Sequence, residues 1–215
     1  MIELVHGKIR LALFPLREGH GRALLLLHGL GERSPAVCAP ELDGWPGPVF
    51  ALDFTGHGRS TVPRGGGYTP EVLMSDADAA LAHLGEACVV GRGLGAYVAV
   101  LLAGGRPENV RGAILRDGPG LAAPSGADLS ACIVRPERGT LRVPDPFALA
   151  ELTHDIRPPD YAALFARLAV RGSGLDPALF VCARERPSWL AGVAREAGVK
   201  CCDLETALAA CAAHP

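Results

Sequence analysis

A glycine-rich turn between an apolar strand and an apolar helix is the feature that most restricts the fold of this chain. The strand is predicted over Cys88–Val90, the turn over Gly91–Gly95 and the helix over Ala96–Ala103. The run Ala23–Leu27 is also continuously apolar, which is typical of a strand buried on both faces of a sheet. Because such strands alternate with predicted helices, the sequence indicates an α/β fold with a mostly parallel sheet and helices on both faces.

The remaining elements fit one domain over residues 1–215. Alternating residues in Ile2–Val5 and Ile9–Phe14 predict an N-terminal hairpin. The other predicted elements are the strands Val49–Leu52, Val110–Leu115, Leu179–Ala183 and Val199–Cys202, and the helices Pro70–Leu84, Ser188–Ala197 and Thr206–Ala213. The alternation of strands and helices is interrupted over residues 118–176, which contain two predicted helices near Phe147–Leu152 and Asp160–Val170. We interpret residues 118–176 as a small lid.

Composition restricts the partners, the location and the cofactors that we expect for this chain. The formal net charge is −2 and no basic block is present, so nucleic-acid binding gains no electrostatic support. The apolar runs are too short to span a bilayer, and the N-terminus lacks the pattern of a signal peptide. Seven cysteines occur without a Cys-x-x-Cys pair or histidines at metal spacing, which indicates reduced thiols in a cytoplasmic protein and predicts no metal or other cofactor.

Three motifs follow predicted strands in order: Leu27–Gly31, Asp53–Ser60 and Gly91–Gly95. Their order and spacing resemble the His-Gly oxyanion loop, the Asp-x-x-Gly-x-Gly-x-Ser loop and the nucleophile elbow of the α/β-hydrolase fold superfamily. The resemblance covers Ala23–Leu115 and extends beyond Leu115 only in the order of the elements. It implies an α/β-hydrolase fold with a cleft between the glycine turn and the lid segment.

The residue at the nucleophile position of the third motif is Gly93, where the resemblance implies Ser, Cys or Asp. Glycine has no side-chain atom that can attack a substrate. Gly91 and Gly95 still allow the strand and helix to approach closely, and Gly93 can adopt a backbone angle that strains other residues by about 1–3 kcal/mol. The sequence therefore predicts a stable turn from which the nucleophile is missing.

The oxyanion hole of the superfamily uses backbone amides, which do not depend on a nucleophile. The resemblance implies Leu30 and Leu94 as the two N–H donors, with His28 and Gly29 in the first loop. Leu94 also opens a helix, whose N-terminus favours an anion or a carbonyl oxygen. Arg92, beside the turn, is predicted to pair either with an anionic ligand or with a nearby carboxylate.

The acid and the base of a triad are missing from the places that the resemblance implies. Asp117, at the end of a predicted strand, is a candidate acid or caps the turn Gly118–Gly120. Glu185, after Leu179–Ala183, is another candidate acid or a solvated partner of neighbouring arginines. The loop that follows Val199–Cys202 contains no histidine.

Histidines elsewhere in the chain offer other candidates for a base. His154, next to Asp155 in the lid segment, points into the cleft or faces solvent. His214 is penultimate in the chain and is predicted to lie in a frayed terminus. His57 occupies a Gly-His-Gly turn and is predicted to tie loops together by hydrogen bonds.

Two main classes of function follow from these residues. In the first, a degenerate triad leaves a non-catalytic protein that binds a small molecule or a protein partner in the cleft. In the alternative, the chain is an active hydrolase of esters or related acyl or C–C substrates, or a lyase, with a non-covalent mechanism and a base such as His154. A role in assembly depends on the Ala-rich helix Thr206–Ala213, which suits either a homodimer or packing on the sheet.

Overall fold

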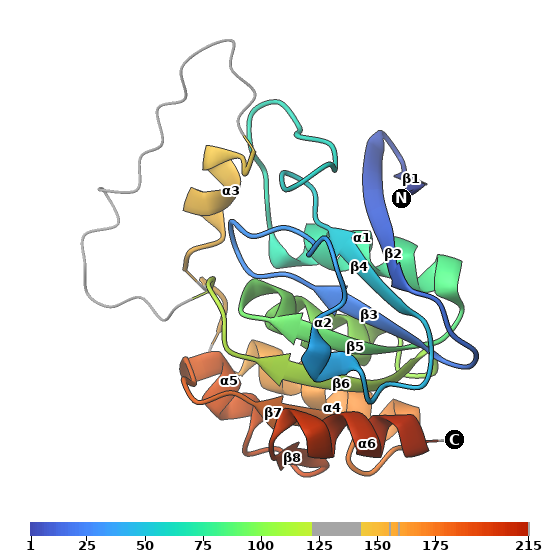
Figure 1. Ribbon diagram of the computed structural model, residues 1–215. Coiled ribbons are helices and arrows are strands. Elements are labelled where there is room, and N and C mark those ends of the chain that lie inside the picture. Colours follow the sequence, from blue (N-terminus) through green and yellow to red (C-terminus); the bar gives the residue numbers. More distant parts are fainter. Residues whose placement is uncertain (122–142, 155, 159, 215) are drawn as a thin grey trace.

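The computed structural model describes residues 1–121, 143–154, 156–158 and 160–214. Eight strands form one sheet in the order β1-β2-β4-β3-β5-β6-β7-β8 (Figure 1). They are β1 (Ile2–His6), β2 (Ile9–Arg17), β3 (Ala23–Leu27), β4 (Val49–Asp53), β5 (Ala87–Arg92), β6 (Val110–Arg116), β7 (Leu179–Cys182) and β8 (Val199–Cys201). Strand β2 pairs antiparallel with β1 and β4, and all other neighbours are parallel. The predicted N-terminal hairpin and mostly parallel sheet are confirmed.

Helices cover both faces of this sheet, as predicted. One face carries α1 (Pro70–Leu84), α2 (Leu94–Gly105), α4 (Tyr161–Ser173) and α5 (Ser188–Val193), and the other carries α6 (Leu204–Ala213). Successive strand residues alternate between the two cores: Leu25 and Val89 pack with the first group of helices, whereas Leu24 and Cys88 pack with α6. The helix α6 therefore packs on the sheet, which is one of the two placements predicted for it.

The helix after the glycine turn is buried along almost its whole length. Every residue of α2 from Leu94 to Gly104 is buried, between the sheet and the helices α1 and α4. A helix that is apolar on all sides is stable only in such a position. Its burial fixes the turn that precedes it. None of the described helices combines the length and the apolar character needed to cross a membrane.

Local capping explains where several helices begin. The Thr69 hydroxyl accepts a hydrogen bond from the N–H of Val72, and Pro70 occupies the first turn, so α1 begins where the sequence predicts. The helix α6 begins two residues earlier than predicted because the Asp203 carboxylate accepts the N–H of Thr206 at 2.8 Å and caps it.

The segment interpreted as a lid contains two helices near the predicted positions. The first, α3 (Pro146–Glu151), is joined to the loop after β4 by a 2.9 Å hydrogen bond from the N–H of Asp145 to the carbonyl of Gly56. The second, α4, packs on α2 through buried alanines such as Ala162 and Ala166. Small side chains allow this close approach, so α4 belongs to the helical layer on the sheet rather than to a lid. Residues 122–142 of the predicted lid lie outside the described residues.

Candidate functional site

Three loops leave the parallel strands side by side at the carboxyl edge of the sheet. Leu27 of β3 pairs with Gly91 of β5, and Gly91 pairs in turn with Leu115 of β6. Because parallel strands end at the same edge, the loops that follow these three residues meet. The candidate site is formed where residues 28–31, 92–94 and 117–120 come together.

The turn predicted as a nucleophile elbow has tight backbone geometry. Gly93 caps α2 with a φ of 54° and a ψ of −112°, a conformation that other residues adopt only with strain. A Cβ atom on Gly91 would collide with the carbonyl of Gly95, and one on Gly95 would collide with the carbonyl of Leu27. Both flanking glycines are therefore required by the close approach of β3, β5 and α2.

The two amides predicted as oxyanion donors converge on one oxygen atom. The backbone nitrogens of Leu30 and Leu94 each lie 2.9 Å from the carbonyl oxygen of Pro119. Two N–H groups that converge on one oxygen have the geometry of an oxyanion hole. The acceptor here is the chain's own Pro119 carbonyl, which follows β6.

The same segment fills the space next to the α carbon of Gly93. A Cβ atom at position 93 would collide with the carbonyl oxygen of Pro119 and the carbonyl carbon of Gly118, and it would lie 2.6 Å from the oxygen of Gly118. A serine side chain at this position therefore has no room while Gly118 and Pro119 keep their places.

Two neutral histidines hold the first loop against the loop that follows β4. His28 Nε2 accepts the N–H of Phe54 at 3.1 Å, so Nδ1 carries the proton and donates it to the carbonyl of Gly29 at 2.8 Å. His57 Nε2 accepts the N–H of Gly31 at 3.2 Å. Burial lowers the pKa of His28 to about 4, with a further contribution from His57, and burial also lowers the pKa of His57. Both rings position the Leu30 amide and lack a free nitrogen for acid–base chemistry.

Arg92 forms an ion pair within the site. Its guanidinium donates to both carboxylate oxygens of Glu32 at 2.9–3.0 Å and to the carbonyl oxygen of Asp117 at 3.1 Å. Glu32 in turn accepts the N–H of Gly29 at 3.0 Å. Of the two partners predicted for Arg92, the structure shows the carboxylate.

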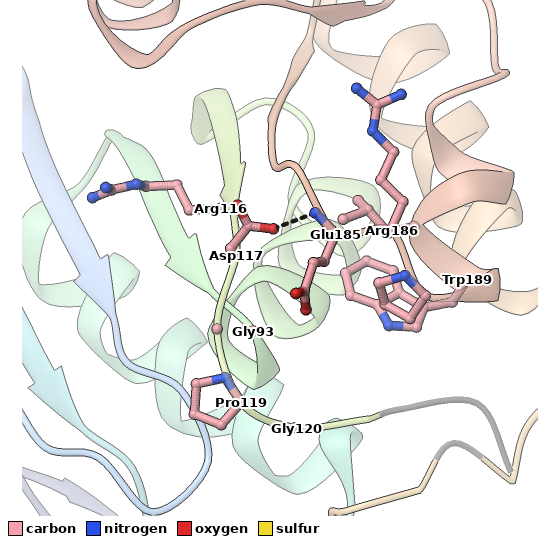
Figure 2. Close-up of a pocket in the computed structure, with 11 residues that line it drawn as sticks. Gly93, Arg116, Asp117, Pro119, Gly120, Glu185, Arg186 and Trp189 are labelled. Carbon is pink, nitrogen blue, oxygen red and sulfur yellow. Dashed lines mark hydrogen bonds between the residues drawn. The ribbon is translucent and has the colours of Figure 1, made fainter. Parts of the chain in front are cut away.

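Asp117 connects the end of β6 to the loop after β7. Its two carboxylate oxygens accept the N–H groups of Arg184 and Glu185, each at 2.8 Å. Figure 2 shows this carboxylate directed toward the backbone of Glu185. In the described part of the chain, no histidine is bonded to Asp117. Its carboxylate serves the backbone of a neighbouring loop, a role that the sequence analysis did not include.

A pocket of about 490 Å³ opens beside Gly93. Its lining includes Arg116, Asp117, Glu185 and Trp189 (Figure 2). The Glu185 carboxylate points into the pocket on the side of Gly93, while the side chains of the two lining arginines point away from it. The ring of Trp189 is buried, and its N–H donates to the carbonyl of Leu121 at 3.2 Å.

The histidines predicted as alternative bases do not line this pocket in the described structure. His154 is partly buried and follows α3. His214 lies at the opposite end of the sheet, where its Nδ1 is 3.0 Å from the carbonyl oxygen of Arg111 near the start of β6. The terminus at His214 is thus held by a side-chain contact, which differs from the predicted fraying. The described residues contain no cluster of three or more histidine, cysteine or carboxylate side chains suited to a metal.

Two other side chains that could act as nucleophiles, those of Ser60 and Cys182, are engaged or unreactive. The Ser60 hydroxyl donates to the carbonyl of Asp53 at 2.5 Å and accepts the N–H of Ala12 at 3.0 Å. Burial raises the pKa of the Cys182 thiol to about 12, so it is protonated at neutral pH. Neither residue lines the pocket beside Gly93.

Pro119, the residue that occupies the two amides, was not predicted from the sequence. A signal was present in the run Asp117-Gly118-Pro119-Gly120 directly after a buried strand. Glycines on both sides of a proline allow the backbone to approach another segment closely. The motif itself does not say which segment it approaches.

The order of the sheet, the helices on both faces and the loops at its carboxyl edge define an α/β-hydrolase fold. Solved structures with this fold are similar over nearly the whole chain. A thioesterase domain from the curacin biosynthetic pathway has a TM-score of 0.62 at 17% identity, with 99% of this chain and 96% of that chain covered. The enol-lactonase from Burkholderia xenovorans LB400 has a TM-score of 0.60 at 16% identity, with coverage of 95% and 91%. At these identities, the likeness shows the fold alone.

The family is shown by the sequence of the chain. Residues 19–137, just over half of the chain, match the family described as serine aminopeptidase, S33, and the chain belongs to this family. The matched region includes the candidate site from Leu30 to Pro119. No curated protein sequence matches the chain.

Proposed function

We propose that this chain is a non-catalytic hydrolase-like protein that binds a small molecule in the pocket beside Gly93. Gly93 is, in this proposal, a vacant nucleophile position. The observation that carries the proposal is the backbone of Gly118 and Pro119, which takes the space of a side chain at position 93 and the hydrogen bonds of Leu30 and Leu94.

This arrangement bears on the three groups that a serine hydrolase needs. Such enzymes need a nucleophile, a base that removes its proton and donors that stabilise the oxyanion. Gly93 supplies no nucleophile, and no histidine is among the described residues that line the pocket. A substrate carbonyl cannot accept hydrogen bonds from the amides of Leu30 and Leu94 while Pro119 occupies them. These features together favour binding over turnover.

The pocket is suited to a small organic ligand. It combines the apolar side chains of Trp189 and Leu190 with the Glu185 carboxylate. A concave site with apolar walls and a few polar groups is the usual form of a small-molecule site. A protein partner, a homodimer and a cytoplasmic location remain predictions from the sequence.

A hydrolysis assay tests the absence of catalysis. The substrates are p-nitrophenyl butyrate, an acyl thioester and an enol lactone, the latter two because a thioesterase domain and an enol-lactonase are among the similar structures. We expect no turnover above the rate in buffer. Turnover that disappears in a folded Leu94→Pro variant would overturn the proposal, because proline removes one donor amide while it is tolerated in the first turn of a helix. A contaminating esterase would be unaffected by this substitution.

The alternative is an active hydrolase or lyase that uses a non-covalent mechanism. The position of Glu185 favours it, because this exposed carboxylate points toward Gly93 and could remove a proton from a water molecule there (Figure 2). In this case native turnover falls about 100-fold or more in Glu185→Gln, which matches the usual contribution of a general base. The same substitution in a protein without turnover changes nothing in the assay.

A further inference from the structure

The Pro119 carbonyl oxygen occupies the position that a ligand oxygen would take at the two oxyanion amides. It accepts from Leu30 and Leu94 at equal distances of 2.9 Å, and these donors come from two different loops. Leu94 is also the first residue of the twelve-residue helix α2, whose N-terminus favours an oxygen with negative charge. The site therefore already holds an oxygen acceptor, and the acceptor belongs to the chain.

The fit between the Pro119 segment and the site depends on glycine on both sides of the contact. A Cβ atom on Gly29 would lie 2.7 Å from the ring of Pro119. A Cβ atom on Gly118 would lie 2.7 Å from the backbone nitrogen of Gly93, and one on Gly120 would lie 2.8 Å from the side chain of Leu94. Distances below 3.0 Å do not occur for real Cβ atoms, so each of these glycines is needed for the occupied state.

On the side that follows β6, the Pro119 segment is held by bonds that water can replace. Arg92 donates to the Asp117 carbonyl, and the Asp117 carboxylate accepts from the amides of Arg184 and Glu185. These three hydrogen bonds are exposed to solvent. Of the two residues that donate to Pro119, Leu94 is buried. Exposed hydrogen bonds exchange with water at little net cost, so residues 117–120 can move away from the two amides. Leu121 stays in the core, where its carbonyl accepts the N–H of Trp189 and its N–H donates to the carbonyl of Leu152.

We propose that Pro119 is a displaceable internal occupant of the oxyanion amides, and that a small carboxylate ligand binds in its place. This inference rests on the proposed function, since a covalent enzyme would present an acyl group instead. A carboxylate oxygen accepts the same two N–H groups as the Pro119 carbonyl and adds a negative charge at the N-terminus of α2. The apparent affinity is reduced by the small fraction of molecules in which the Pro119 segment has left.

The test uses hexanoate as the probe and compares Gly118→Ala with Gly44→Ala in the full chain. A Cβ atom at position 118 expels the Pro119 segment, whereas one at position 44 has no neighbour within 4 Å. Titrations are followed through the backbone amide signals of Leu30 and Leu94 by NMR. Hydrogen exchange at the same amides reports whether the segment has left, because native protection depends on the bonds to Pro119.

We expect Gly118→Ala to bind hexanoate about 10-fold tighter or more than the native chain, with faster exchange at both amides and with Gly44→Ala unchanged. Equal affinity in all three proteins, no binding in any of them, or signal changes confined to other residues overturns the inference. If Gly118→Ala does not fold, Asp117→Asn decides on the same criteria, because the NH2 group of asparagine replaces one of the two carboxylate oxygens that accept an N–H and cannot accept it. Ester turnover, which would overturn the proposed function, is measured in a separate assay. The binding results for hexanoate can therefore be interpreted whether or not turnover is found.

Discussion

The loops after β3 and β4 keep their shape in a different way from the loops after β6 and β7. The first pair is held by three buried polar side chains, those of His28, Asp53 and His57. Each of them accepts a backbone N–H from the loop on the other side. Among the described residues, the second pair is joined by the exposed bonds of Asp117 and by the bond from the Trp189 N–H to the Leu121 carbonyl. The glycine turn lies between the two regions. The first region provides the Leu30 amide and the turn provides the Leu94 amide, whereas the second region is where an acid was expected.

This difference has a physical basis. Amide donors and tight turns are part of the backbone, so the packing of the sheet and of α2 maintains them whether or not a reaction takes place. Catalytic side chains contribute little to folding and are often costly to stability, so a fold can lose them without penalty. The predictions below test whether the two regions differ in stability as their contacts indicate.

The largest effect is expected from Gly95→Ala. The added Cβ collides with the carbonyl of Leu27, a backbone atom in the centre of the sheet, and overpacking of this kind costs about 3 kcal/mol or more. Urea unfolding measures the loss, with Gly44→Ala as the control. A Gly95→Ala protein as stable as its control would show that β3 and α2 are not packed as tightly as described.

A smaller but still large effect is expected from Asp53→Ala, compared with Asp203→Ala. The buried Asp53 carboxylate accepts the N–H groups of Ser34 and Arg59 at 2.7 and 2.8 Å, and its loss leaves both without that acceptor, at a cost of about 3 kcal/mol. The exposed Asp203 caps α6, and its removal costs about 1 kcal/mol. The loss in the free energy of unfolding should therefore be about threefold larger for Asp53→Ala than for Asp203→Ala. Equal losses would mean that the buried bonds of Asp53 stabilise the fold no more than an exposed helix cap does.

The pH dependence of the unfolding free energy reports on the protonation of His28. The unfolded chain takes up a proton at this residue near pH 6.5, but burial lowers the pKa of folded His28 to about 4. Stability therefore falls as the pH falls from 6.5 toward 4, by about 2–3 kcal/mol from this residue. Burial raises the pKa of Asp76 to about 6, which acts in the opposite direction.

The difference between native protein and His28→Gln removes the contribution of Asp76, which both proteins share. Urea midpoints at pH 7.0, 5.5 and 4.5 are expected to fall more steeply in the native protein than in the variant. Parallel pH profiles would mean that His28 is not held neutral in the folded state.

The smallest effect is expected from Glu185→Gln. This exposed side chain makes no hydrogen bond or ion pair with the described residues, so its substitution should change stability by less than about 0.5 kcal/mol. Thermal unfolding of both proteins measures the change. A loss of more than 1 kcal/mol, beyond what a solvated carboxylate can contribute, would assign Glu185 a structural contact.

Much of the fold follows from local sequence signals. The helix α1 is specified by Thr69 and Pro70, the strand β3 by its apolar run, and the glycine turn by Gly91 and Gly95. Within the site, the residues of both donor amides were also predicted, because Leu30 and Leu94 occupy fixed positions in their motifs. These features depend on residues that are close together in the chain.

The tertiary structure decided what those amides bind. Pro119 reaches Leu30 and Leu94 only because β6 lies beside β5 with Leu115 in register with Gly91. It also decided that Arg92 pairs with Glu32 and that Asp117 binds the loop after β7. The sequence by itself thus determined the strands, the helices and the glycine turn. The occupant of the site depended on contacts between distant segments, which strand order and register create and which no local pattern encodes.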